Sequence, residues 1–401
     1  MMKNLSVNNG RITDGVCPVS LRGVNLGGWL MPEAYFTCAP NRGYRYLREG
    51  FVKVHGEAEF RTLATAFRAA FITEKDFAQI AGMGFNSVRL PFHYALMEES
   101  PYVYSHEGVA CLDQAIRWGK KYHLRIILDM HAVPGAQNHD WHSDSDGKAR
   151  FWTSKAFQRR AIALWVFLAD RFKDEPVIAG YDLLNEAVTG DDKGLNAYYQ
   201  ALIKAIRAVD KNHILFVEGN RWAQDIECLD NFDDKNLVLG IHFYEPLEFT
   251  FNFVPGLKYP LIGKNARWDK AFMRQRLEAL FKVAQKRGRA LWCGEFGVNA
   301  RDGLYGEDVW LSDILTQFNT MGIHWTYWTW KAVKHHMFPD GVNSYLPNPP
   351  WVNRPGPKAG WETWHLHWLD QQKDMVASWK TQAFTPNQAI VKALKNGLKD
   401  Q

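Results

Sequence analysis

Two glutamates that end apolar, strand-like runs carry the most evident chemistry in this sequence. Glu186 closes the run IAGYDLLNE (178–186), and Glu295 lies near the end of the run ALWCGEF (290–296). A short apolar run that stops at polar residues is typical of a buried strand that delivers side chains to its carboxyl end. Cleavage of a glycosidic bond needs two carboxyl groups: one protonates the leaving oxygen, and the other attacks the anomeric carbon or activates a water. The sequence therefore predicts a two-carboxylate hydrolytic site.

The two carboxyl groups must differ in charge to do this work. The acid needs a pKa raised from about 4.3 towards about 6 to 7, by burial or by the other carboxylate, whereas the nucleophile must stay ionised. Arg89 lies inside the otherwise apolar run SVRLPF, and a neighbouring cation would hold Glu295 in its charged form. A separation of about 5 to 5.5 Å between the carboxyl groups would predict retention of configuration, and about 6.5 to 9.5 Å would predict inversion.

Glutamates 109 residues apart meet only if a closed fold brings their strands together. Strand-like runs alternate with helical ones along the chain, at residues 21–26, 87–92, 125–131, 178–186, 214–218, 237–244, 290–296 and 324–330. Alternation of this kind predicts a parallel sheet, and eight strands are the number that closes into a barrel. A chain of 401 residues suits one decorated barrel. We therefore predict an α/β fold, a single (β/α)₈ TIM barrel forming one catalytic domain over residues 1–401.

Several connections are longer than a plain barrel requires. Residues 29–55 are too many for a simple loop, which predicts a functional segment or a lid. Residues 132–145 form a polar loop after the third strand, and residues 331–370 form a Pro- and Trp-rich segment after the eighth. We expect extended loops after strands one, three, six and eight. Amphipathic spacing predicts helices between the strands, among them one that begins at the capping-box-like Thr73 to Asp76 and a short closing helix at 388–396.

Polar residues end the apolar runs with unusual regularity. Besides the two glutamates they are Arg89, His131, His242, Tyr244 and Trp328. Any one of them alone is more often a satisfied structural group, because ion pairs and core histidines also end strands. All of them together at the carboxyl ends of the strands predict one functional site, since barrel enzymes keep their chemistry on that face.

Composition excludes several classes of protein. Apolar residues make up 46% and charged residues 23% of the chain, as in globular proteins. The formal net charge is +5 without a block of Lys or Arg, so we expect no nucleic-acid partner. No apolar run is long enough to span a bilayer, and the first residues lack the apolar core of a secretory signal, so we expect a cytoplasmic protein with no membrane partner.

Cysteine and tryptophan usage add two further expectations. The five cysteines are scattered, odd in number and without CxxC spacing, which predicts neither a disulfide framework nor a structural zinc site. We expect no cofactor and no metal. The 17 tryptophans favour a carbohydrate substrate, because aromatic rings are amphipathic surfaces suited to the apolar faces of sugars.

Seven strand-end motifs in order resemble those of glycoside hydrolase family 5, the cellulase-like retaining β-glycosidases. They are RGVNLGGWL, SVRLPF, LDMHAVPG, DLLNE, IHFYEP, CGEFG and the run around Trp328, and they span residues 22–330. The resemblance implies that Glu186 is the acid/base and that Glu295 is the nucleophile. It also implies supporting or substrate-binding roles for Arg89, His131, Asn138, Trp141, Asn185, His242, Tyr244 and Trp328.

Within that family the opening motif and the stretch MHAVPGAQN are most similar to the exo-β-1,3-glucanase and β-glucosidase-like branch. The resemblance there implies that Asn185 contacts the sugar 2-hydroxyl, that Arg89 and Tyr244 hold Glu295, that His131 and His242 line the catalytic subsite and that Trp328 is a platform under the sugar. The loop continues as HDWHSD (139–144) instead of a Gly-rich sequence, which leaves linkage and exo or endo action open. An endo-β-1,4-glucanase or a β-mannanase is the alternative.

Two other classes of protein also fit parts of the sequence. A metal-dependent barrel hydrolase would draw ligands from His131, His139, His142, His365 and His367, although no HxH closes the first strand. A sugar-binding barrel without activity is the second, and the presence of both glutamates argues against it. Competing carboxylates are Glu33, Asp182, Glu218 and Glu245, of which Glu218 also ends a strand and is expected to be structural or to contact substrate. The oligomeric state is not predicted.

Overall fold

A closed barrel of eight parallel strands forms the centre of the protein. The structure is a computed structural model that describes residues 2–37, 42–263, 267–345 and 363–399. The strands close in the order β10-β13-β14-β3-β4-β7-β8-β9, so each neighbours the next along the chain. Their bounds are β3 (Arg22–Asn25), β4 (Ser87–His93), β7 (Arg125–Ala132), β8 (Ile178–Asp182), β9 (Ile214–Glu218), β10 (Leu237–His242), β13 (Ala290–Glu295) and β14 (His324–Tyr327). The predicted TIM barrel is confirmed.

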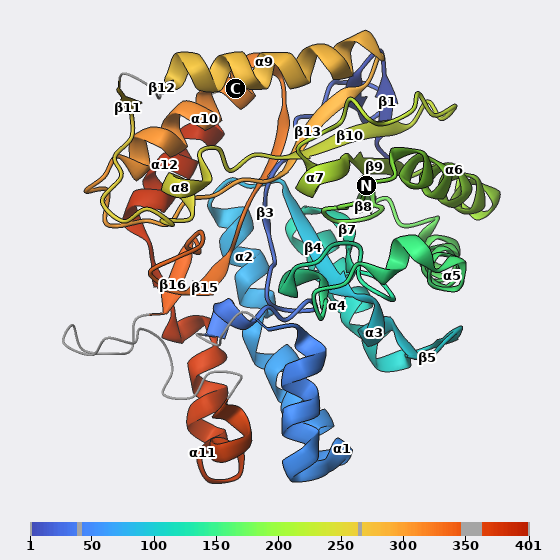
Figure 1. The fold of residues 1–401 in the computed structure, drawn as a ribbon, viewed down its shortest axis with the longest axis vertical. Helices are drawn as coiled ribbons and strands as arrows, with labels where there is room; N and C mark the ends of the chain where they lie inside the picture. Colours follow the sequence, from blue (N-terminus) through green and yellow to red (C-terminus); the bar gives the residue numbers. More distant parts are fainter. Residues whose placement is uncertain (1, 38–41, 264–266, 346–362, 400–401) are drawn as a thin grey trace.

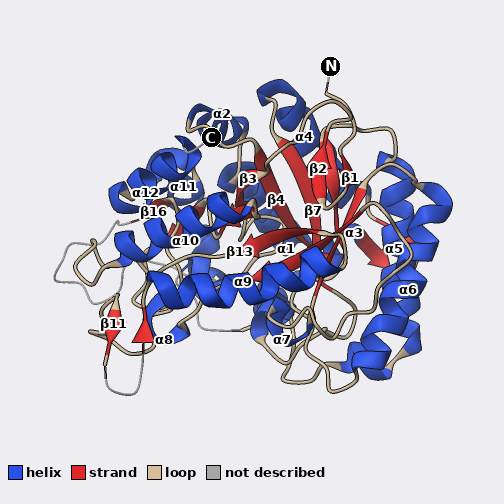
Figure 2. Cartoon of the chain, turned by 90° about the horizontal axis from the view of Figure 1, so that it is seen from above, coloured by secondary structure: helices blue, strands red, loops and turns tan. Residues whose placement is uncertain are grey.

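Helices surround the barrel and connect its strands (Figure 2). The long ones are α1 (Tyr44–Phe71), α2 (Glu74–Gly82), α4 (His106–Tyr122), α5 (Lys155–Phe172), α6 (Asp192–Val209), α9 (Lys270–Lys286), α10 (Glu307–Met321) and α12 (Gln388–Lys399). The predicted capping box starts α2, where the Thr73 N–H donates to Asp76 Oδ2 at 2.8 Å. Ser154 and Asp269 cap α5 and α9 by accepting from the backbone N–H three residues on.

The amino end of the barrel is closed by an apolar hairpin that the sequence did not indicate. Strands β1 (Ser6–Asn8) and β2 (Arg11–Thr13) pair antiparallel within what looked like a polar lead-in. Leu5 and Ile12, each 1% exposed, are its buried residues. They pack against apolar side chains from five barrel strands and the chain before β3, namely Leu21, Ile127, Ala179, Ile214, Phe216, Val238, Ala290 and Trp292. Ile12 is the single buried residue of β2, and Leu5 comes just before β1, so the apolar pattern is too short to predict.

The predicted long loop at residues 29–55 is in part a helix. Only residues up to 37 and from 42 are described there, and α1 already begins at Tyr44. Helix α1 lies side by side with α11 (Trp364–Trp379), a helix not predicted in the Trp-rich segment (Figure 1). Buried Lys331 fastens this pair to the barrel by donating to the carbonyls of Phe71 and Trp379. The part of that segment at residues 346–362 lies outside the described residues.

Short elements elaborate the carboxyl end of the barrel. They are α3 (Tyr94–Met97), β5 (Glu98–Ser100), β6 (Val103–Tyr104), α7 (Asn220–Ala223), α8 (Leu247–Thr250), β11 (Leu261–Ile262), β12 (Arg267–Trp268), β15 (Lys331–Val333), β16 (Asn343–Tyr345) and β17 (Thr385–Pro386). Short 3₁₀ helices lie at Ala34–Thr37, Trp141–Ser143, Arg150–Thr153 and Thr381–Ala383. Four cysteines are free thiols, at Cys17, Cys111, Cys228 and Cys293. Among the described helices none has the length and apolarity needed to cross a membrane.

Candidate active site

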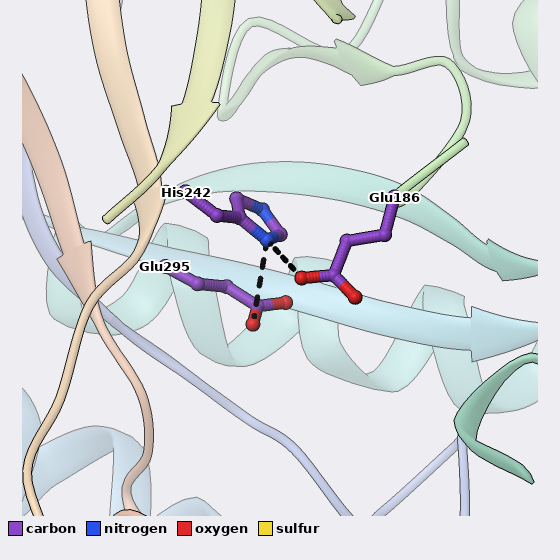
Figure 3. A group of neighbouring side chains, drawn as sticks. All are labelled: Glu186, His242 and Glu295. Carbon is purple, nitrogen blue, oxygen red and sulfur yellow. Dashed lines mark hydrogen bonds and ion pairs between the residues drawn. The ribbon is translucent and has the colours of Figure 1, made fainter. Parts of the chain in front are cut away.

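A cavity of about 650 Å³ opens at the carboxyl end of the barrel and selects two of the six candidate carboxylates. Glu186 and Glu295 line it, whereas Glu33, Asp182, Glu218 and Glu245 do not. Their carboxyl groups point towards each other across His242 (Figure 3). One oxygen of Glu186 and one of Glu295 lie within 4.8 Å of each other. This spacing falls short of the about 6.5 to 9.5 Å that an inverting mechanism needs for its water.

Glu295 is held on both of its oxygens. Arg89 Nη1 donates to Oε1 at 2.7 Å, and the Tyr244 hydroxyl donates to Oε2 at 2.8 Å. Both donors were expected to hold this carboxylate. Because Arg89 and Tyr244 each bond to a different oxygen, the orientation of this carboxyl group towards the cavity is fixed. A carboxyl group held in this way is suited to contact a bound substrate in one geometry.

Arg89 is fully buried and organises the floor of the site. Its guanidinium contacts four carboxylates, with nearest distances of 3.1, 2.8, 3.2 and 2.7 Å to Asp129, Asp182, Glu218 and Glu295. It also donates to the side-chain oxygen of Asn185 at 2.8 Å. The four carboxylates outweigh the cost of burying this cation and raise the pKa of Arg89 well above its usual value. Arg89 is therefore permanently charged, and it ties strands β4, β7, β8, β9 and β13 to one point.

The backbone at Glu186 is strained and clamped. Strand β8 ends at Asp182, so Glu186 lies on the loop that follows, with φ at 46°. That left-handed conformation costs a non-glycine residue about 1 to 2 kcal/mol. Both backbone groups are held, because the Glu186 N–H donates to Glu218 Oε2 at 2.7 Å and its carbonyl accepts from Asn138 Nδ2 at 3.0 Å. Glu218 thus has a structural role, one of the two expected of it, and Asn138 holds the Glu186 carbonyl.

The side chain of Glu186 contacts two histidines. Its Oε1 lies 2.7 Å from His242 Nδ1, and its Oε2 lies 3.5 Å from His142 Nδ1. His242 Nε2 in turn lies 2.9 Å from Glu218 Oε1. His242 is therefore surrounded by carboxylates. Burial alone lowers the pKa of His242, but the charges of Glu218 and Glu295 and the bond to Glu186 raise it well above its usual value.

The pKa of Glu186 is not raised in the way that an acid requires. Burial does raise the pKa of Glu186, but the hydrogen bond and charge of His242 and the charge of His142 outweigh burial and lower it below 4.5. The 2.7 Å contact lets Glu186 and His242 share one proton between them. The sequence placed a histidine at residue 242 but gave no means of seeing that it faces Glu186.

One wall of the cavity is aromatic. The Trp328 ring stacks on His131 with centroids 5.5 Å apart and an interplanar angle of 8°, and its indole N–H donates to the Tyr35 hydroxyl at 2.5 Å. His131 Nδ1 lies 2.7 Å from Asp129 Oδ2. Burial lowers the pKa of His131, but Asp129 and Glu33 raise it to about 10. A protonated donor and a flat ring at this position suit a sugar face and its hydroxyls.

The predicted site residues fall into two sets. His131, Trp141, Tyr244 and Trp328 line the cavity with the two glutamates. Arg89, Asn138, Asn185 and His242 are buried behind that lining. The predicted contact of Asn185 with a sugar hydroxyl stays a prediction.

Other residues of the lining were not identified from the sequence. They include Tyr35, Asp140, Trp222, Phe251, Phe253 and Phe338. Tyr35 and Phe338 lie in the long connections that the sequence marked as functional or elaborated. Trp222 had no such signal.

The histidines considered as metal ligands do not come together. Among the described His, Cys, Asp and Glu side chains, the group of three with ligand atoms within 4.8 Å of one another is Glu186, His242 and Glu295. None of the histidines of the metal alternative belongs to that group. His139 is exposed on the loop after β7, and His365 and His367 lie on α11. The set of histidines considered for the metal alternative therefore does not form a common site among the described residues.

Comparison with known proteins decides the family. A model described as cellulase (glycosyl hydrolase family 5) matches residues 52–334, most of the chain. The chain belongs to glycosyl hydrolase family 5. Hydrolases of this family retain the anomeric configuration, so the protein is a retaining glycoside hydrolase. The resemblance seen in the strand-end motifs is confirmed.

Similar proteins within the family carry different activities in their names. A β-xylosidase from Phanerodontia chrysosporium is 34% identical over 330 residues, covering 79% of this chain and 68% of that protein. Endoglucanase C from Acetivibrio thermocellus is 28% identical over 354 residues, covering 79% and 92%. A probable glucan 1,3-β-glucosidase A from Aspergillus niger is 28% identical over 235 residues, covering 56% and 55%.

The fold has solved counterparts as well. The crystal structure of endoglucanase Cel5A from Thermotoga maritima matches with a TM-score of 0.63 at 20% identity, covering 93% of this chain and 96% of that one. At this identity the match concerns the barrel itself and not its substrate.

Proposed function

We propose that this family 5 enzyme hydrolyses β-linked, glucose-containing oligosaccharides by double displacement, with Glu295 as nucleophile and Glu186 as acid/base. The observation that carries the proposal is the meeting of these two carboxyl groups within 4.8 Å in one cavity. Each has the partners its role requires. Glu295 is fixed by Arg89 and Tyr244, and Glu186 is in contact with a histidine that can hold the proton to be delivered.

In the first step Glu295 attacks the anomeric carbon and forms a glycosyl ester. Glu186, with His242 behind it, gives a proton to the departing oxygen. Bound sugar excludes water from the cavity, and this additional desolvation raises the pKa of Glu186 and moves the shared proton onto it. The Tyr244 hydroxyl and Arg89 keep the Glu295 carboxylate oriented towards the anomeric carbon while it loses its negative charge on forming the ester.

In the second step Glu186 acts as the base for a water that breaks the ester. Once Glu295 is an ester, it no longer carries the negative charge that disfavours a second anion nearby. The pKa of Glu186 therefore falls between the two steps, which is the change that a residue serving first as acid and then as base requires. The His242 contact at 2.7 Å stabilises the carboxylate that results.

The aromatic wall favours removal of single sugars from a chain end. Tyr35, Trp141 and Phe338 come from loops after three different strands, β3, β7 and β14, and their rings meet at centroid distances of 5.9, 5.2 and 5.9 Å. Glu186 must lie on the leaving-group side of the scissile bond. This ring contact adjoins the Trp328 platform, because the Tyr35 hydroxyl accepts a hydrogen bond from the Trp328 indole. A wall there would stop the chain after one sugar, as in an exo-β-1,3-glucanase or a β-glucosidase.

An endo-acting alternative is kept because of the relatives. The endoglucanase of Acetivibrio thermocellus aligns with 79% of this chain and the glucan 1,3-β-glucosidase with 56%. An endo enzyme needs a groove open at both ends so that a chain can pass across the glutamates. The contact of Tyr35, Trp141 and Phe338 is the feature against it.

Digestion of a defined panel tests the proposal. β-1,3-, β-1,4- and β-1,6-linked gluco-oligosaccharides, β-1,4-manno-oligosaccharides and an aryl β-xyloside would be incubated with the enzyme, and products followed over time. We expect glucose to appear first and one unit at a time from the non-reducing end. Early release of internal fragments would establish endo action. Absence of glucose from every linkage, with xylose or mannose released instead, would contradict the sugar assignment.

A further inference from the structure

The loop after β7 places a second histidine against Glu186. The sequence HDWHSD (139–144) departs from the pattern of the family branch it resembles, and the mechanism above does not use it. In the structure His142 Nδ1 lies 3.5 Å from Glu186 Oε2, the oxygen that His242 does not bond. The two histidines therefore face the two oxygens of the same carboxylate from different elements, His242 from β10 and His142 from the 3₁₀ helix Trp141–Ser143.

Asp140 lies on the far side of the His142 ring. Its Oδ2 lies 3.6 Å from His142 Nε2 and accepts a hydrogen bond from the Trp222 indole N–H at 2.7 Å. The result is a chain of contacts from Trp222 at the mouth of the cavity through Asp140 and His142 to Glu186. All four residues line the cavity. A carboxylate behind an imidazole fixes its orientation and stabilises its protonated form.

The backbone turn that carries Trp222 has an unusual conformation. Arg221, Trp222 and Ala223 are consecutive residues with φ at 55°, 57° and 58°, a conformation that non-glycine residues adopt at a cost. Gly219 starts this turn where a side chain would not fit, since a Cβ there would lie 2.1 Å from the Asp225 carbonyl oxygen. The turn places the Trp222 indole, on the loop after β9, in hydrogen-bond contact with Asp140, on the loop after β7.

The carboxylates around His142 favour its protonated, cationic form. Burial lowers the pKa of His142, but the neighbouring Asp140, Glu186 and Glu33 raise it above its usual value. The other titratable groups that face Glu186 are His242 from β10, Glu218 from β9 and Glu295 from β13. His242 also contacts Glu218 and Glu295, whereas the carboxylates in contact with His142 are Glu186 and Asp140.

We propose that His142, oriented by Asp140, is a positioning residue that sets how tightly Glu186 and His242 hold the catalytic proton. This inference rests on the proposed acid role of Glu186. A cation 3.5 Å from Glu186 Oε2 favours the carboxylate form. His142 therefore makes Glu186 a stronger acid and lowers the pH at which the acid form is lost. The alkaline limb of the pH profile of activity therefore reports the coupled titration of Glu186, His242 and His142.

The test is a set of pH profiles of kcat/KM for the wild type and the variants His142→Gln, Asp140→Asn and His139→Gln. His139 is the matched control, because it is a histidine of the same loop that is exposed and does not line the cavity. Each profile is measured with an aryl β-glucoside of poor leaving ability, which needs the acid, and with a dinitrophenyl glucoside, which does not. Thermal unfolding is recorded for every variant.

We expect His142→Gln to move the alkaline limb up by about 1 pH unit with the poor leaving group, and to leave the dinitrophenyl profile in place. Asp140→Asn should move it in the same direction by less, since His142 remains but its cation is weaker. His139→Gln should match the wild type. Asp140→Asn carries the test alone if His142→Gln does not fold.

Two results would overturn the inference: a His142→Gln limb at the wild-type pH, or an equal shift in His139→Gln. A failure of the proposed function looks different. In that case Glu186→Gln would keep both the rate and the alkaline limb with the poor leaving group, whatever the His142 variants do.

Discussion

The buried charged groups at the two ends of the barrel have different surroundings. At the carboxyl end, Arg89, His242 and the carboxylates around them converge on an open cavity with Glu186 and Glu295 at its surface. At the amino end, an apolar hairpin closes the barrel. A charged pair there, Asp210 and His213, lies just before β9. The Tyr181 hydroxyl donates to Asp210 Oδ2 at 2.7 Å, and His213 Nδ1 lies 2.6 Å from the same oxygen.

Charge and burial therefore do not by themselves mark the active site. Asp210 with His213, and Glu186 with His242, are both carboxylate and histidine pairs in close contact. The difference is that the first pair is bonded to other protein groups, the Tyr181 hydroxyl and the Glu175 carbonyl, whereas the second lies at a cavity that substrate can fill. We expect changes at the carboxyl end to alter turnover with little effect on folding, and changes at the amino end to do the reverse.

The largest effect is expected at Glu295. Glu295→Gln removes the nucleophile while keeping its size, and Arg89 retains three other carboxylates, so the fold should persist. We expect kcat to fall by at least about 10⁴-fold, with unfolding by circular dichroism little changed. Residual activity near the wild-type level, in a preparation free of contaminating enzyme, would break the assignment of this residue.

Glu186→Gln should follow, with an effect that depends on the leaving group. Loss of the acid costs about 10² to 10⁴-fold with a poor leaving group and much less with a dinitrophenyl group that departs unaided. The comparison of kcat/KM across a series of aryl glucosides measures this dependence. An equal loss for every leaving group would mean that Glu186 positions substrate instead of supplying a proton.

At the amino end, Ile12→Ala tests whether the hairpin contributes stability alone. Ile12 is 1% exposed within the apolar cluster, so truncation should lower the free energy of unfolding by about 2 to 5 kcal/mol. Denaturant titration measures the loss. The kcat at a temperature well below the transition should stay within twofold of the wild type, and a larger fall would mean that the two ends are coupled.

The smallest effect is expected at Asp210, and it depends on pH. Burial raises the pKa of Asp210, but the bond and charge of His213 lower it from 3.8 to about 2. A carboxyl group with a lowered pKa stabilises the fold fully above its unfolded value, so this contribution is present above about pH 4 and is lost as the pH falls towards 2.

Asp210→Asn should therefore cost about 1 to 3 kcal/mol at pH 7 and less in acid. Melting temperatures measured from pH 7 to pH 2.5 would show the wild-type and variant curves converging. Curves that stay parallel would mean that the stabilisation comes from the packing of the Asp210 side chain and not from its ionised carboxyl group.

The barrel and its two glutamates were predictable because they depend on local patterns. Each strand is an apolar run with a polar end, and eight such runs in alternation with helices allow one closed arrangement. Glu186 and Glu295 then meet as a consequence of topology. Arg89 was identifiable as a cation in an apolar strand, and its bond to Glu295 follows from that same closure.

The features that escaped prediction are contacts between distant segments. Helix α11 packs on α1 through Trp364 and Trp379 against Phe67, a pairing that no local pattern encodes. The lowered pKa of Glu186 depends on two histidines from separate elements, His242 at the end of β10 and His142 on the loop after β7, which lie within 2.7 and 3.5 Å of it. The Trp222 turn needs three left-handed residues in a row, and nothing in their types, Arg, Trp and Ala, signals it.

Trapping of the covalent intermediate tests the central claim most directly. A 2-deoxy-2-fluoro-β-glucosyl fluoride slows both steps but leaves a good departing group, so the ester accumulates and can be located by peptide mass spectrometry. We expect one glycosyl unit per chain, attached to Glu295, and none in Glu295→Gln. A label on another carboxylate such as Glu218, or a wild-type enzyme that turns over without ever carrying a label, would contradict the account.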